Sequence, residues 1–331
     1  MSLLERRYRT VLRLLPASYR AEREEEMVAA YLEYAGEVPD ELGPRPRFGE
    51  IASIAGLALR VRLAGATGAP RYFAWGETVR TAALFGLALQ ATLAVAGIAS
   101  ALMLPPEIVV MGVPVPADTL VDLGAMVDGV LWLAAYVALA RGAVRPAKIA
   151  AGAAVLWDLG YLVWEAFPPP QLRDPYFLLA ALPLLALLAG FHRDAPPARR
   201  SWWAALLPPV LAGGIVSLVN TRFFAEIWLG GDPARVDTYA AWMGLPRLLT
   251  ITILAAAAVL LIRRASAPLL LALAGCALLV LLLLVGTMVV SYGTTTDAWI
   301  QCTILTVVAL TLAVTGWRRL PVLDRLRERS G

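Results

Sequence analysis

The residues best suited to chemistry are polar side chains that interrupt long apolar segments. Ionisable groups inside a bilayer cost about 2.5–3.5 kcal/mol each on insertion scales, so each one is a functional hypothesis. Carboxylates and guanidinium groups together could hold a polar ligand or pair with one another. The residues concerned are Asp122, Asp128, Asp158, Asn220, Arg222 and Arg247.

Three of these charges are predicted to share one depth. At about 1.5 Å per residue, Asp128 lies roughly 13 Å below the outer surface, Asp158 roughly 10 Å and Arg247 roughly 12 Å. The economical arrangement is a carboxylate–guanidinium cluster facing the bundle interior, with Arg222 and Asn220 slightly nearer the outer surface. Three interpretations stay open, and the first two are a structural clasp between helices and a site open to the outside in which a ligand replaces one partner. A proton or ion pathway is a third, although no acidic residue in the inner half of any span continues a relay.

The segments that carry these residues are long and apolar. Of the 331 residues, 59% are hydrophobic and 16% are charged, whereas a soluble domain has about 25% charged and 45–50% apolar residues. About 20 apolar residues suffice to cross a bilayer as a helix. Eight segments qualify: 80–104, 119–140, 147–166, 175–192, 202–225, 239–262, 267–290 and 298–317.

The positive charges support eight crossings with both termini on the inner side. Cytoplasmic segments of membrane proteins carry an excess of Lys and Arg. With an even number of spans, 25 of the 29 cations fall in the inner segments. The exceptions are Arg173, Arg222, Arg235 and Arg247.

Residues 1–70 differ from the rest because they are dense in charge, and their apolar residues recur at helical spacing. A first helix is predicted to stop at Pro16, a second to begin at Ser18 as N-cap and end at Gly36, and a third to follow the loop 38–46. We expect a three-helix head whose core contains Tyr8, Leu12, Met27, Tyr31 and Ile51. The full apolar stripes are Leu4, Tyr8, Val11, Leu12 and Leu15; Met27, Ala30, Tyr31 and Tyr34; and Phe48, Ile51, Ile54, Ala55, Ala58 and Val61.

The head resembles a known module in the runs Leu3-Leu4-Glu5-Arg6-Arg7-Tyr8, Leu12-Arg13-Leu14-Leu15-Pro16, Tyr19-Arg20 and Glu24-Glu25-Glu26-Met27. Over about the first 65 residues it is similar to the HAAS-type helical signalling domain, which also resembles the prefix of some bacterial permease-like proteins. The resemblance implies a cytoplasmic module ahead of a membrane region, often encoded beside a PadR-like transcription regulator. The membrane region itself stays unassigned.

The resemblance implies a protein partner for the head. The exposed charges predicted to contact that partner are Arg6, Arg7, Arg13, Glu24 and Glu25. The alternative is a solvated helical cap that only helps to fold and orient the first span.

Several classes of function lack their signatures. The chain has no Gly-x-x-x-x-Gly-Lys phosphate loop and no His-Glu-x-x-His helix. Its one histidine, His192, and its two separated cysteines, Cys276 and Cys302, form no catalytic or metal-binding pattern. The net charge is +4, but the basic residues form no continuous face that could bind nucleic acid. We therefore expect no enzyme, cofactor, metal or direct nucleic-acid contact.

The sequence as a whole predicts an all-α protein of the bacterial inner membrane. Residues 1–70 would form the cytoplasmic head, 71–317 an eight-span domain in the lipid bilayer, and 318–331 a basic cytoplasmic tail. The expected function is a sensor or anchor whose head binds a regulatory protein. The alternative is a transporter or permease subunit with a polar site in the outer half of the bundle, and an oligomer is compatible with either function.

Overall fold

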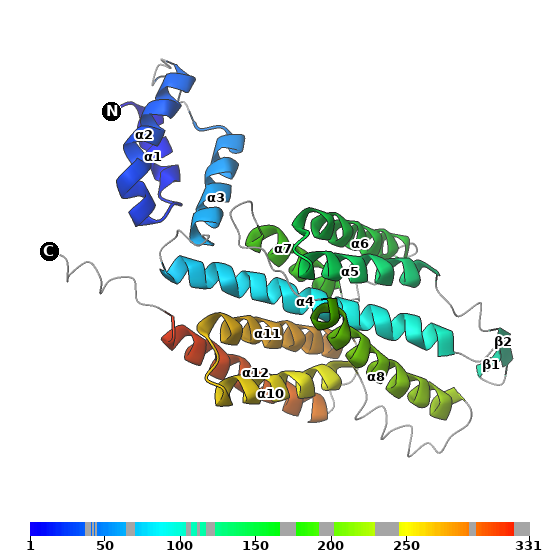
Figure 1. Ribbon diagram of the computed structural model, residues 1–331. Helices are drawn as coiled ribbons and strands as arrows, with labels where there is room; N and C mark the ends of the chain where they lie inside the picture. Colours follow the sequence, from blue (N-terminus) through cyan, green and yellow to red (C-terminus); the bar gives the residue numbers. More distant parts are fainter. Residues whose placement is uncertain are drawn as a thin grey trace. The chain divides into compact units, whose positions relative to one another are not determined.

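The chain is described by a computed structural model, in which the described residues form helices and one short hairpin (Figure 1). The structure describes residues 1–36, 41, 43, 45–63, 70–103, 107–110, 113–116, 123–165, 177–191, 202–228, 245–290 and 296–320. Its helices are α1 (Leu3–Leu12), α2 (Ala17–Ala35), α3 (Phe48–Arg62), α4 (Pro70–Met103), α5 (Leu123–Ala140), α6 (Val144–Glu165), α7 (Phe177–Gly190), α8 (Trp202–Trp228), α10 (Leu245–Ile262), α11 (Ala267–Val290) and α12 (Thr296–Arg318).

The hairpin was not expected from the sequence. Strands β1 (Glu107–Val110) and β2 (Val113–Pro116) pair antiparallel, with Val110 opposite Val113. Valine-rich runs favour strands, because the β-branched side chain fits a pleated surface. The segment between the first two expected spans is therefore partly β.

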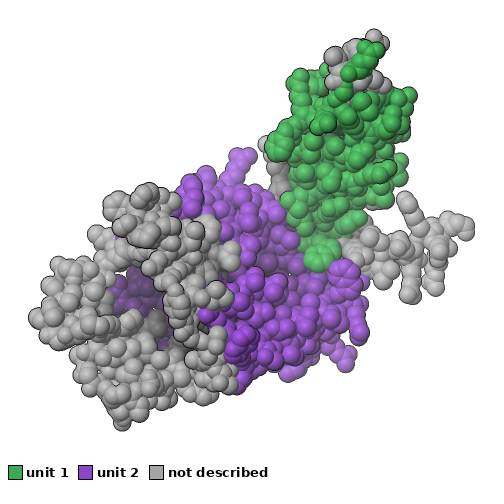
Figure 2. All heavy atoms as spheres, turned by 180° about the vertical axis from the view of Figure 1, so that it is seen from behind, with its two compact units in different colours: residues 1–77, 192–196, 321–331 green, residues 78–191, 197–320 purple. Residues whose placement is uncertain are grey.

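The chain divides into two compact units, coloured separately in Figure 2. One is built on residues 1–77 and the other on residues 78–191 and 197–320. We call the part of the first unit formed by α1, α2 and α3 the head.

The three helices of the head have clear start and stop signals. The Ser2 hydroxyl accepts a hydrogen bond from the Glu5 amide, and the Glu50 carboxylate accepts one of 2.7 Å from the Arg47 amide at the start of α3. Pro16, with its fixed φ, precedes α2, so this helix begins at Ala17 rather than after an N-cap at Ser18. Gly36 ends α2 with a φ of 66°, a left-handed value that glycine adopts without strain.

The head has its own hydrophobic core, formed by all three helices. The buried residues of this core are Tyr8, Leu12, Leu15, Val28, Ile54 and Ala58. Of the expected core residues, Tyr8 and Leu12 are buried, Met27 and Tyr31 pack partly buried against the cluster, and Ile51 is half-buried outside it.

Two aromatic residues predicted to face this core do not. Phe48 is 85% exposed and Tyr34 is 74% exposed. Each lies six residues from the most buried residue of its helix, Ile54 or Val28. Six residues turn an α-helix by about 600°, which places these side chains well away from the buried face.

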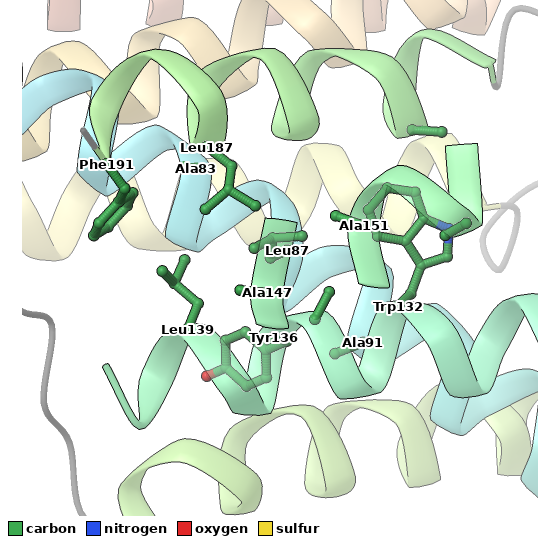
Figure 3. Close-up of a cluster of buried hydrophobic side chains, with 13 residues drawn as sticks. Ala83, Leu87, Ala91, Trp132, Tyr136, Leu139, Ala147, Ala151, Leu187 and Phe191 are labelled. Atoms are coloured by element: carbon green, nitrogen blue, oxygen red, sulfur yellow. The ribbon is translucent and has the colours of Figure 1, made fainter. Parts of the chain in front are cut away.

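The second unit contains two hydrophobic clusters. The first joins α4, α5, α6 and α7, with Leu87, Trp132, Tyr136 and Leu187 among its buried members (Figure 3). The second joins α10, α11 and α12.

Helix α4 is approached closely by three neighbours, each at a glycine. A Cβ on Gly129 of α5 would lie 3.4 Å from the Ala94 Cβ, and one on Gly190 of α7 would lie 3.2 Å from the Arg80 backbone nitrogen. A Cβ on Gly213 of α8 would lie 2.7 Å from the Val95 Cβ. Small residues at such contacts let helix backbones approach closely, which is how helices pack in lipid.

By length and composition, three helices among the described residues can cross a membrane: Tyr72–Leu102, Ala267–Gly286 and Ala298–Arg318. Shorter apolar stretches occur at Met126–Ala140, Ala180–Gly190, Leu206–Val219 and Leu248–Ile262. These properties are compatible with a membrane protein. Each of the eight segments expected to span overlaps one of the helices α4–α8 and α10–α12.

Candidate functional site

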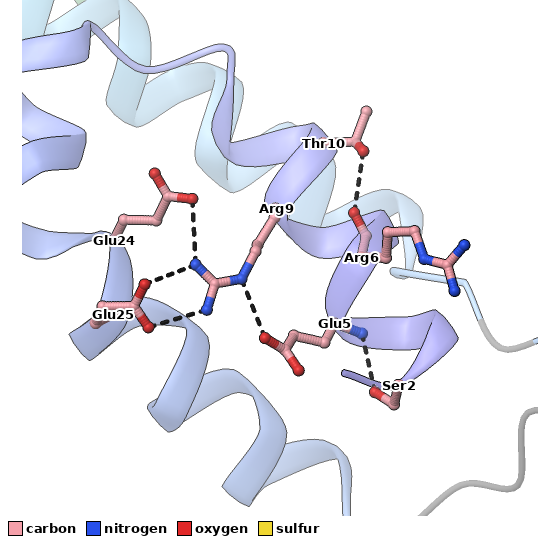
Figure 4. A network of polar contacts seen from close by, with 7 residues as sticks. All are labelled: Ser2, Glu5, Arg6, Arg9, Thr10, Glu24 and Glu25. Atoms are coloured by element: carbon pink, nitrogen blue, oxygen red, sulfur yellow. Dashed lines mark hydrogen bonds and ion pairs between the residues drawn. The ribbon is translucent and has the colours of Figure 1, made fainter.

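The candidate sites are a network in the head and a polar pair in the second unit. In the head, Arg9 links α1 to α2 (Figure 4). Its guanidinium donates to Glu25 at 2.7 and 2.9 Å, to Glu5 at 3.1 Å and to Glu24 at 3.5 Å. The hydrogen bond from Arg9 holds the pKa of Glu25 below its ordinary value, and the carboxylates of Glu25 and Glu5 raise the pKa of Arg9.

A second contact joins all three helices of the head. The rings of Tyr8 and Tyr31 stack with centroids 3.9 Å apart and planes 9° from parallel. The Tyr31 hydroxyl donates to the Glu50 carboxylate of α3. Burial, then the negative charge of Glu50 and this hydrogen bond, raise the pKa of Tyr31 to about 12.

The structure separates the five charges expected to contact a partner. Glu24 and Glu25 are engaged by Arg9, and Arg7 donates a 2.6 Å hydrogen bond to the Gly43 carbonyl. Arg6, in the first turns of α1, and Arg13, just after α1 ends, are exposed. The five residues therefore do not form one free charged face.

The head has exposed aromatic residues that were not predicted from the sequence. We call Tyr34 and Phe48 the aromatic end, because α2 finishes beside Tyr34 and α3 begins at Phe48. The Tyr31–Glu50 hydrogen bond, one turn inward from this end, ties the two helices together. Helical spacing alone could not identify Tyr34 as exposed, because Tyr34 lies seven residues after Met27, only about 20° away around the helix.

In the second unit, the structure brings together two of the polar residues expected inside the bilayer. Helices α5 and α6 form an antiparallel hairpin whose turn contains Gly142, with a φ of 81°. Asp128 and Asp158 lie 14 and 16 residues from Gly142, so both are roughly 21–24 Å from the turn. Their carboxylates are close enough to interact electrostatically.

Asp128 has an unusual environment. The Trp132 side chain, one turn later on α5 and buried, is a hydrogen-bonding partner of its carboxylate. Within the described part of the chain, the other oxygen, Oδ1, is buried and has no hydrogen-bond donor.

The remaining members of the expected polar cluster lie outside the residues whose side chains are described. Asp122 precedes α5, whereas Asn220 and Arg222 belong to α8 and Arg247 to the first turn of α10. The carboxylate–guanidinium cluster therefore stays a prediction, and the structure supplies only its Asp128–Asp158 part.

One interhelical contact was also missed. The hydroxyls of Ser100 on α4 and Ser217 on α8 share a hydrogen bond of 3.1 Å. Ser217 lies one turn beyond Gly213 on the same helix face, so the spacing Gly-x-x-x-Ser was the available signal.

Comparisons with protein families, with curated proteins and with solved structures found no match to this chain.

Proposed function

We propose that this chain is a multi-pass protein of the bacterial inner membrane whose cytoplasmic head binds a regulatory protein. The membrane part would anchor that regulator or sense a signal for it. The observation that carries the proposal is the aromatic end of a head with its own core. Large exposed aromatic side chains are the residue type that dominates binding energy at protein interfaces. In the absence of a partner, their exposure to water is unfavourable.

The membrane part of the proposal rests on the apolar helices and on the distribution of charge. We infer eight crossings, one for each of α4–α8 and α10–α12, with both termini in the cytoplasm. The turn after α10 supports this topology. Arg264 occupies a left-handed position there, with a φ of 51°, where glycine would be free of strain. The arginine supplies a positive charge at a turn that the proposal places inside.

The proposed partner is a soluble regulator, and a PadR-like protein is the first candidate because of the resemblance of residues 1–65 to the HAAS-type domain. The aromatic end would provide the main contacts and Arg6 a charged one at the start of α1. Glu24 and Glu25 stabilise the head internally through Arg9, so we no longer expect them to carry the interaction.

The partner hypothesis predicts loss of binding when the aromatic end is truncated. In the full-length protein, Tyr34→Ala with Phe48→Ala should weaken capture of a PadR-like regulator from the same genome at least 30-fold, because a truncated interface anchor costs about 2 kcal/mol or more. Affinity would be measured by biolayer interferometry on protein in lipid nanodiscs.

Leu59→Ala is the matched control, because Leu59 is also an exposed apolar residue of the head but lies near the end of α3. It should leave the affinity unchanged. Equal affinity for the wild type and the double variant would overturn the partner hypothesis.

A second candidate function is transport. It is favoured by the Asp128 carboxylate, which interacts with Asp158 and whose buried Oδ1 accepts no hydrogen bond from any described residue. A polar ligand or cation at this place would satisfy the oxygen that no described residue satisfies. In this function the Asp128–Asp158 pair, together with Arg247, forms the binding site.

The transport hypothesis predicts two effects of Asp128→Asn. Without ligand, the variant should melt about 2–4 °C higher for each kcal/mol gained by removing the buried charge. With a panel of amino acids, sugars and organic ions, any solute that raises the melting temperature of the wild type should have no effect on the variant. Tryptophan fluorescence during heating measures both effects. Glu33→Gln, which removes a negative charge from an exposed residue of the head, is the control. A variant that melts lower and keeps the solute effect would contradict this function.

A further inference from the structure

The head carries a basic and apolar surface at the end opposite its aromatic end. The ends of α1 and α3 meet there, because Nη2 of Arg62 donates a 2.8 Å hydrogen bond to the Leu14 carbonyl. We call the exposed residues around this contact the basal surface: Arg13, Leu14, Leu59, Arg60 and Arg62.

The basal surface carries three arginines and no acidic residue. Glu5 and Glu50 lie at the other ends of α1 and α3, in the first turn of each helix. Arg6, Arg7 and Arg47 lie at those ends as well. On α2, which begins at the basal end, Arg20 pairs with Glu24 at 3.6 Å, and Glu22 is the first acidic residue along the helix. The basal surface is therefore positive.

Apolar side chains lie between these arginines. Leu14 is 43% exposed and Leu59 is 49% exposed. A mixture of arginine and leucine suits a membrane interface, because the leucines enter the boundary of the acyl chains and the long arginine stems keep their charges among the phosphates.

Only a short stretch of chain separates this surface from the first candidate span. Six residues, 64–69, separate Leu63 at the end of α3 from Pro70 at the start of α4. The seven steps between Leu63 and Pro70 can reach at most about 25 Å, and the first candidate span begins at Tyr72. The cytoplasmic leaflet is rich in anionic lipid and attracts basic residues close to a membrane helix.

We propose that the basal surface docks on the anionic lipid headgroups of the membrane that the chain itself spans. Arg13 and Arg60 bind lipid phosphates, Leu14 and Leu59 insert at the interface, and Arg62 fastens α3 to the end of α1. Docking leaves the aromatic end directed to the cytoplasm. The proposal does not depend on the identity of the regulator.

The test uses the full-length protein with Cys276 and Cys302 replaced by alanine and a fluorophore attached at Ala17→Cys, an exposed position at the start of α2. The protein is reconstituted in phosphatidylcholine vesicles, with or without phosphatidylglycerol, that contain a spin-labelled headgroup as quencher. Quenching should be strong only with the anionic lipid, and it should fall at 1 M salt, where the screening length is about 3 Å.

Arg13→Gln with Arg60→Gln should lower the ratio of docked to undocked head about 30-fold, because each basic residue near an anionic surface contributes about fivefold. Arg6→Gln with Arg45→Gln removes the same charge from exposed positions away from the basal surface and should retain quenching. Equal quenching in neutral and anionic vesicles would overturn the proposal. So would unchanged quenching of the Arg13/Arg60 variant, or a loss of regulator binding by that variant without any loss of quenching.

Discussion

Leu12→Ala should unfold the head and leave the apolar helices intact. Leu12 is 0% exposed and belongs to the core shared by α1, α2 and α3. Truncating a buried leucine to alanine costs about 2–5 kcal/mol. A unit of about 60 residues has little stability in reserve, so a loss of this size should leave most heads unfolded.

Hydrogen–deuterium exchange on the full-length protein in detergent measures this effect region by region. Peptides from α1, α2 and α3 should lose their protection, whereas peptides from α4 to α12 should keep it. Leu14→Ala is the matched control, because it removes the same atoms from an exposed side chain two residues away. If Leu12→Ala leaves the protection of the head unchanged, the core described for the head is wrong.

Gly213→Ala should separate α8 from α4, whereas Gly214→Ala should be nearly silent. A Cβ on Gly213 would lie 2.7 Å from the Val95 Cβ and 2.8 Å from the Thr92 carbonyl oxygen, and a backbone oxygen cannot simply move aside. Nothing lies within 4 Å of a Cβ built on Gly214. Overpacking of this kind costs about 1–3 kcal/mol, and the hydrogen bond between Ser100 and Ser217 should be lost with it.

Thermal unfolding in detergent, followed by tryptophan fluorescence, compares the two glycine variants. Gly213→Ala should lower the melting temperature by about 2–4 °C for each kcal/mol lost, and Gly214→Ala should melt within about 1 °C of the wild type on the same scale. Equal melting temperatures for the two variants would contradict the close contact between α4 and α8.

The pattern of apolar residues predicted where helices occur better than which faces they bury. Gly36 ends α2 as expected, because its backbone preference acts locally, whereas α1 already ends at Leu12, before Pro16. The inward placement of Phe48 and Tyr34 was wrong, because helical spacing groups both with the apolar stripes, whereas both lie at helix ends, beyond the buried core. The hairpin at β1 and β2 was missed because no element was expected between the spans 80–104 and 119–140.

The candidate sites, too, were predicted from the sequence only in part. The depths of Asp128 and Asp158 follow from counting residues along two helices, and the structure does bring these carboxylates near one another. The role of Arg9 was hidden, because its partners Glu24 and Glu25 are brought to it only by the turn between α1 and α2. Contacts across a turn depend on the packing of helix faces, which residue spacing alone does not determine.

The most direct test of the account is the topology of the chain in living bacteria. Two reporters would be fused after Gly142, Arg264 and Gly331: a fluorescent protein that matures only in the cytoplasm, and alkaline phosphatase, which is active only outside it. At these three positions the fluorescent protein should be bright and the phosphatase inactive. Fusions after Gly112 and Gly293 should give the opposite result. Phosphatase activity at Gly331, or at a reporter placed before Met1, would put an end of the chain outside and contradict an even number of crossings with a cytoplasmic head.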